Sequence, residues 1–211
     1  MKAILWDNDG VLVDTEPCYF EASRVALLRL DVEFDESSYV ECLRQGTSCF
    51  ELARARGASE SAIAAARAAR DAHYAELISG GIVLIPGVRE ALESLHGRVP
   101  MAVVTSSQPH HFELQHARTG ARRFFELVVT RADYANTKPD PEPYLVAAAR
   151  LGIAPADCLA VEDTERGLVS ATRAGMRCAA IPRWLSARGD FRAAWRVLRN
   201  ATEVPELFAH W

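Results

Sequence analysis

Short apolar runs bounded by polar or turn residues recur along the chain and predict buried β-strands. They lie at residues 3–6, 100–104, 127–130, 158–161 and 178–181. The last four are separated by segments long enough for a helix. This alternation is typical of a parallel sheet with helices on both faces. The sequence therefore predicts an α/β fold with a doubly wound, Rossmann-like core.

The stretch between the first two apolar runs breaks this rhythm. About ninety residues lie there, far more than a single crossover connection needs. Helical patterns fill most of the stretch, at residues 17–30, 35–43 and 59–78. Asp35 and Ser59 are candidate N-caps for the second and third of these helices. We therefore predict that the two strands are separated by helices alone.

The boundaries of this insertion follow from its turn residues. Gly80–Gly81 ends the helical patterns, and a helix predicted at residues 88–95 returns the chain to the sheet. We predict an all-helical insert at residues 16–82. The core is then formed by residues 1–15 and 83–211.

Polar side chains stand where the predicted strands end. They are Asp7-Asn8-Asp9-Gly10 after the first strand, Thr105-Ser106-Ser107 after the second, Lys138 beyond the third and Glu162-Asp163 after the fourth. Each group alone is an ordinary turn, helix cap or solvated loop. Because ligands bind beyond the carboxyl ends of the strands in such sheets, their ordered placement indicates one shared site.

The residue types at these strand ends point to phosphoryl transfer. Four carboxylates in one crevice repel each other, so a cation is needed to neutralise some of them. Oxygen ligands of this kind suit Mg²⁺. A cation beside a lysine and short hydroxyls binds phosphate, and a carboxylate can attack phosphorus to form an aspartyl phosphate. The sequence therefore predicts a magnesium-dependent phosphoryl-transfer site.

The chain resembles the haloacid dehalogenase superfamily over essentially its whole length, in particular its phosphatase and phosphomutase branch with a helical cap. Four motifs in order carry the resemblance: Asp7-Asn8-Asp9-Gly10-Val11-Leu12-Val13-Asp14-Thr15, Met101 to Thr105, Lys138-Pro139, and Glu162-Asp163-Thr164-Glu165-Arg166-Gly167. The resemblance implies that residues 16–82 form a cap domain. Such a cap closes over the crevice, excludes water during the first transfer and contacts the substrate.

The resemblance also implies roles for the catalytic residues. Asp7 resembles the nucleophile and a magnesium ligand. Asp9 resembles the general acid/base, and its main-chain carbonyl would also ligate magnesium. Thr105 and Lys138 would hold the transferring phosphoryl oxygens.

The remaining site residues complete the metal shell and the substrate contacts. Glu162 and Asp163 resemble further magnesium ligands, and Ser106 is a candidate substrate contact. Arg44 and Arg70 lie in the predicted cap, where a guanidinium fork suits a second phosphate or carboxylate. A solvated cap surface is the alternative interpretation of these two arginines.

The leading functional hypothesis is a magnesium-dependent phosphatase for a small phosphorylated metabolite, such as a sugar phosphate or phosphoglycolate. The alternative is a β-phosphoglucomutase-like phosphomutase, whose cap carries a histidine, an arginine and a lysine. Those positions correspond here to Tyr19, Cys49 and Arg70, which favours the phosphatase. A dehalogenase lacks the second aspartate, present here as Asp9. A promiscuous phosphatase and a non-catalytic member of the fold remain open, although the complete carboxylate set is unexpected in the latter.

Composition narrows the partners and the compartment. The net charge is −4 and no basic run occurs, which argues against nucleic acid. The apolar stretch that follows Met1 is too short for a secretory signal or a membrane span. The five cysteines are odd in number and scattered, as expected for reduced thiols. We predict a cytoplasmic monomer or small homo-oligomer.

Overall fold

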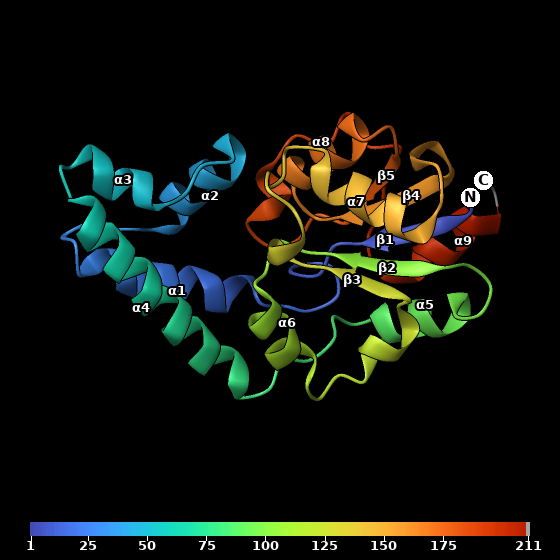
Figure 1. Ribbon diagram of the computed structural model, residues 1–211, viewed down its shortest axis with the longest axis horizontal. Coiled ribbons are helices and arrows are strands. Elements are labelled where there is room, and N and C mark those ends of the chain that lie inside the picture. Colours follow the sequence, from blue (N-terminus) through green and yellow to red (C-terminus); the bar gives the residue numbers. More distant parts are fainter. Residues whose placement is uncertain (210–211) are drawn as a thin grey trace.

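The computed structural model describes residues 1–209 and contains a six-stranded parallel sheet in the order β3-β2-β1-β4-β5-β6 (Figure 1). The strands are β1 Ala3–Trp6, β2 Met101–Val104, β3 Leu127–Val129, β4 Cys158–Glu162, β5 Arg177–Ala180 and β6 Arg196–Val197. In the central register, Ile4 lies opposite Met101 on one side and Leu159 on the other. The strand order reverses between β1 and β4, and ligands bind at such a switch point. The predicted doubly wound α/β fold is confirmed.

Both faces of the sheet are buried, which explains why its central strands read as continuous apolar runs. Ile4 and Trp6 belong to the hydrophobic cluster on one face, whereas Ala3 and Leu5 belong to the cluster on the other. The first face is covered by helices that include α5 (Val88–Leu95), α6 (Pro109–His116) and α9 (Val204–Ala209), and the second by α7 (Glu142–Leu151) and α8 (Glu165–Arg173). The side chains within the central strands thus pack into the two cores, and polar groups stand only where these strands end.

The insert between β1 and β2 contains four helices that lie to one side of the sheet (Figure 1). They are α1 Glu16–Leu28, α2 Glu36–Gln45, α3 Phe50–Ala55 and α4 Glu60–Ser79. These helices have an apolar cluster of their own, which Leu185 joins from the chain beyond β5. The insert leaves and rejoins the core at adjacent points, because Val13 and Leu84 form an antiparallel bridge.

Local sequence signals account for most of these elements. The side chains of Asp35 and Ser59 accept hydrogen bonds from the backbone at Ser38 and Ala62, so both predicted N-caps are confirmed. The helix predicted at residues 88–95 has these bounds in the structure. Three short elements were not predicted, helices α3 and α9 and the two-residue edge strand β6, because none of them is long enough to show a period. Within residues 1–209, no helix combines the length and the apolar character needed to cross a membrane.

Candidate active site

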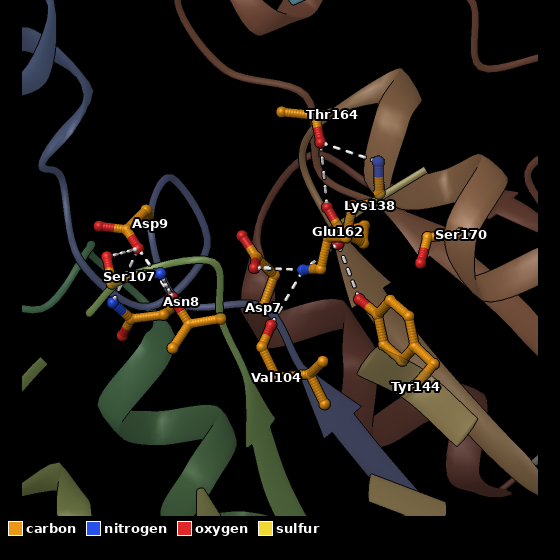
Figure 2. Close-up of polar contacts among 12 residues, drawn as sticks. Asp7, Asn8, Asp9, Val104, Ser107, Lys138, Tyr144, Glu162, Thr164 and Ser170 are labelled. Atoms are coloured by element: carbon orange, nitrogen blue, oxygen red, sulfur yellow. Dashed lines mark hydrogen bonds and ion pairs between the residues drawn. The ribbon is translucent and has the colours of Figure 1, made fainter. Parts of the chain in front are cut away.

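Lys138 stands at the centre of the strand-end groups (Figure 2). Its Nζ donates to Asp7 Oδ1 at 2.6 Å and to Glu162 Oε1 at 2.7 Å. A third hydrogen bond runs from Nζ to the carbonyl of Val104 at 2.9 Å. Only 3% of the lysine side chain is exposed. Lys138, in the loop beyond β3, thus lies as one buried cation between the ends of β1 and β4. The sequence predicted that these strand-end groups share one site.

Glu162 is fixed on both of its oxygens. Tyr144 donates to Oε1 at 2.7 Å, and Thr164 donates to Oε2 at 3.3 Å. A Cβ at Gly167 would overlap this carboxylate, which explains the glycine in the fourth motif. Glu162 therefore acts first as the buried partner of Lys138.

Three carboxylates form a group that fits a divalent cation. Oxygens of Asp7, Glu162 and Asp163 lie within 4.8 Å of one another. Asp163 is buried, and its Oδ1 has no hydrogen-bond partner among the residues that the structure describes. A Cβ at Gly10, which has a φ of 85°, would overlap the other oxygen of Asp163. An unsatisfied buried carboxylate oxygen beside two further carboxylates is the donor set that a hard cation binds.

The electrostatics of the protein without a cation agree with this fit. Burial raises the pKa of Asp7 to about 7, although the neighbouring Lys138 opposes the shift. Burial, followed by repulsion from Asp7 and Glu162, also raises the pKa of Asp163 well above its ordinary value. Burial works against the charge of Lys138, but the two carboxylates outweigh it and raise the pKa of this lysine. The group therefore carries more negative charge than one lysine stabilises.

Asp9 belongs to a second group, which is separate from the lysine in Figure 2. Its carboxylate accepts six hydrogen bonds, three on each oxygen. The donors to Oδ1 are Thr15 Oγ1 (2.6 Å), Gln115 Nε2 (2.8 Å) and Tyr74 OH (3.3 Å). The donors to Oδ2 are Ser107 Oγ (2.8 Å), Thr105 Oγ1 (3.1 Å) and Asn8 Nδ2 (3.2 Å). The two aspartates of the first motif thus have different partners. Asp7 meets a cation, whereas Asp9 meets neutral donors.

Comparison with known proteins agrees with the four motifs. Residues 4–181 match the family model described as haloacid dehalogenase-like hydrolase. The chain belongs to this family. It is 33% identical over 223 residues to protein CbbY (plasmid) of Cupriavidus necator, covering 98% of this chain and 88% of that protein. It is 31% identical over 177 residues to the fructose-1-phosphate phosphatase YqaB of Escherichia coli, covering 82% of this chain and 92% of that protein.

A solved structure shares the fold of this haloacid dehalogenase-like chain along nearly its full length. The crystal structure of CbbY from Rhodobacter sphaeroides in complex with phosphate superimposes with a TM-score of 0.83 at 27% identity. The match covers 97% of this chain and 96% of that one. The chain is therefore an enzyme of the haloacid dehalogenase family, a phosphoric monoester hydrolase.

The two arginines of the insert differ in their surroundings. Arg70 donates to Tyr19 OH at 2.5 Å and to Asp71 at 2.7 Å, and its guanidinium lies over the ring of Tyr19. Arg44 pairs with Glu41 at 2.6 Å and lines a surface hollow that also includes Glu165. Arg70 is thus a held, half-buried cation, whereas Arg44 is a surface one.

Sequence reasoning missed several residues of the site. Thr15 ends the first motif and Ser107 ends the polar group after the second predicted strand, but the sequence predicted no role for either. Tyr74 and Gln115 lie within helices, where no local pattern distinguishes a residue that points to a distant carboxylate. Asn8 lies between the two aspartates of the first motif, where the resemblance assigns it no role.

Proposed function

We propose that the protein is a magnesium-dependent phosphatase that hydrolyses a small phosphorylated metabolite through an aspartyl phosphate on Asp7. The observation that carries the proposal is the buried Asp7–Lys138–Glu162 group beside the unpartnered oxygen of Asp163. A sugar phosphate is the substrate class that the relatives favour. Besides the fructose-1-phosphate phosphatase, a phosphorylated carbohydrates phosphatase of Thermotoga maritima is 30% identical over 182 residues.

The proposed first step joins Asp7 to the phosphoryl group. A carboxylate oxygen of Asp7 attacks phosphorus, the bond from phosphorus to the leaving oxygen breaks, and Asp9 gives that oxygen a proton. In the second step Asp9 takes a proton from the water that hydrolyses the aspartyl phosphate. Magnesium, held by Asp7 and Asp163 with Glu162 and the carbonyl of Asp9 as further candidates, would neutralise charge on the phosphoryl group.

Lys138 and the hydroxyls after β2 hold the reacting groups in this scheme. Lys138 keeps Asp7 in one orientation and adds positive charge where the phosphoryl group gathers negative charge. Thr105 and Ser106 follow β2 and would bind phosphoryl oxygens. Because Thr105 donates to Asp9 Oδ2 in this structure, its hydroxyl has to exchange this hydrogen bond for one to a phosphoryl oxygen as the substrate is bound.

We also propose that residues 16–82 form a cap domain over the site. Two hydrogen bonds that connect the insert and its first hinge to the site support this proposal. Tyr74 of α4 contacts Asp9, and Thr15, at the start of α1, donates to the same carboxylate. Closure would exclude water from the first transfer, and opening would admit water for the second.

The contacts of the insert favour a phosphatase over a phosphomutase. A mutase has to retain a second phosphate group beneath a closed cap. Of the three positions expected to bind it, Cys49 is buried and uncharged, and Tyr19 is engaged by the guanidinium of Arg70. Arg70 is then the one cation at the three positions where a mutase would use a histidine, an arginine and a lysine.

Product analysis separates the two reactions. We expect release of inorganic phosphate from sugar monophosphates with Mg²⁺, no release with excess chelator, and no requirement for a bisphosphate activator. The test incubates the enzyme with β-glucose 1-phosphate, Mg²⁺ and a trace of the 1,6-bisphosphate. If glucose 6-phosphate forms much faster than inorganic phosphate, the protein is a phosphomutase and the proposed phosphatase activity is wrong.

Asp163→Asn is expected to raise the stability of the protein without metal and to remove its response to magnesium. Folding raises the pKa of Asp7 and Asp163. The stability that these two groups contribute to the folded protein is therefore fully present below their unfolded pKa, near 4, and is lost as the pH rises. For Asp7 this loss is complete above about pH 7. At pH 7.5 the variant should melt about 2–4 °C higher for each kcal/mol of relieved repulsion.

Thermal unfolding with chelator and with Mg²⁺ measures both effects. Asp31→Asn changes an exposed carboxylate and should leave both melting temperatures and the magnesium response unchanged. A wild-type protein whose melting temperature is the same with Mg²⁺ and with chelator would contradict the proposed cation site.

A further inference from the structure

A chain of buried polar side chains leads away from Asp9 into the core. Asn8, at 0% exposure, donates from Nδ2 to Gln115 Oε1 at 2.6 Å. Gln115, at 1% exposure, donates from Nε2 to Asp9 Oδ1 at 2.8 Å. Behind Asn8, His116 Nε2 lies 2.7 Å from Asn8 Oδ1. Figure 2 shows Asn8 directly beside Asp9.

The hydrogen bonds of this chain have one consistent direction. Burial lowers the pKa of His116 to about 4, so the imidazole is neutral and carries one N–H. Asn8 Oδ1 only accepts, so that N–H is on Nε2, and Nδ1 is left to accept from Thr119 Oγ1 at 2.9 Å. The histidine N–H thereby faces the oxygen of the Asn8 amide, whose NH₂ faces Gln115.

The same logic fixes Gln115. Its oxygen has to face the NH₂ of Asn8, so its own NH₂ has to face Asp9. The hydroxyl donors around Asp9 can rotate their protons to other acceptors, whereas this amide cannot reverse without breaking the bond to Asn8. Among the donors to Asp9, the amides of Gln115 and Asn8 are thus the two whose direction is tied to the buried chain.

A purely structural role explains this arrangement poorly. Replacing both partners of a buried hydrogen bond by apolar side chains of the same shape is often neutral or stabilising, so stability alone does not require a polar chain here. The neighbouring helix residue Phe112 shows that α6 supplies apolar side chains to the core at this level. The function of the polar chain is therefore to be sought at Asp9, where the chain ends.

We propose that Asn8, Gln115 and His116 are positioning residues for Asp9. Gln115 holds Oδ1 of this carboxylate in place while Oδ2 exchanges its present hydroxyl donors for the leaving oxygen, and the three residues act without touching the substrate. This inference rests on the proposed function, in which Asp9 transfers the proton. Loss of the chain should therefore slow proton transfer and leave substrate binding unchanged.

The test uses two variants of His116 and two substrates. His116→Leu removes the donor to Asn8, whereas the amide of His116→Gln can replace it. For glycerol phosphate, whose alkoxide leaving group needs a proton, kcat/KM should fall at least about tenfold in His116→Leu, with KM within about twofold of the wild type. For p-nitrophenyl phosphate, whose leaving group departs without a proton, kcat/KM should stay within about twofold. His116→Gln should recover most of the loss.

Gln115→Met provides a second, independent variant, because it removes the direct donor to Asp9 at similar size. It should show the same dependence on the leaving group, and it carries the test if His116→Leu does not fold. Gln108→Met is the matched control, since Gln108 is exposed at the start of the same helix, and it should behave as the wild type.

Asp9→Asn distinguishes failure of this inference from failure of the proposed function. If Asp9→Asn is inactive toward glycerol phosphate while folded His116→Leu and Gln115→Met are fully active, the positioning role is wrong and the acid/base role stands. Equal losses on both substrates, or a loss confined to KM, would also overturn the positioning role. If Asp9→Asn keeps wild-type activity, the acid/base role itself is wrong.

Discussion

Replacing Asp7 by asparagine is expected to abolish hydrolysis of phosphate monoesters while the protein stays folded. An amide has no nucleophilic oxygen to attack phosphorus, so kcat should fall by at least about 10⁴-fold. The amide is nearly isosteric with the carboxyl group. Because burial raises the pKa of Asp7 to about 7, a neutral side chain is also well tolerated at this position. Phosphate release with Mg²⁺ measures the first effect, and thermal unfolding measures the second.

The control for this variant is the neighbouring acid/base. Asp9→Asn should also be slow on alkyl phosphates, but it keeps the nucleophile and can still be phosphorylated by a substrate with a good leaving group. Appreciable magnesium-dependent turnover by well-folded Asp7→Asn would exclude Asp7 as the nucleophile.

Replacing Lys138 by methionine is expected to have the largest effect on stability as well as a severe effect on activity. Lys138 is the buried cation between Asp7 and Glu162, and its removal leaves two buried carboxylates without their partner. Breaking a buried ion pair in this way typically costs about 3–5 kcal/mol of unfolding free energy. Phosphoryl transfer should fail at the same time, because positive charge at the reacting group is lost.

Denaturant unfolding in the presence of chelator measures this cost. Lys2→Met is a matched control, because Lys2 forms an exposed pair with Asp157 at 2.8 Å, and such a pair contributes little to stability. A loss for Lys138→Met no larger than that of Lys2→Met would show that Asp7 and Glu162 do not depend on the lysine.

The elements that the sequence predicted well are those whose signal is local or repeated. The central strands are buried on both faces, and the strand-end groups had to meet because parallel strands end at one edge of the sheet. The short elements α3, α9 and β6 were not predicted for the opposite reason, since a helix of six residues and a strand of two show no period.

The sequence indicated which strand-end residues lie together, but it did not indicate how they are arranged. The carboxylates, Lys138 and Thr105 could be named from motifs, but no local pattern shows that Asp9 turns away from Asp7 toward neutral donors. Gln115 and His116 contact residues more than a hundred positions earlier in the chain, so only the packing of α6 against the first loop brings them to the site.

Chemical trapping of the intermediate tests the central claim most directly. Borohydride reduces an acyl phosphate, so a phosphorylated aspartate is converted to homoserine and can be located by mass spectrometry. The enzyme would be treated during turnover of a sugar phosphate with Mg²⁺, digested with trypsin, and compared with samples that lack substrate or contain Asp7→Asn. We predict homoserine at position 7 in the peptide that begins at Ala3, and only in the active wild-type sample. Turnover without this modification, or modification at another carboxylate, would contradict the mechanism.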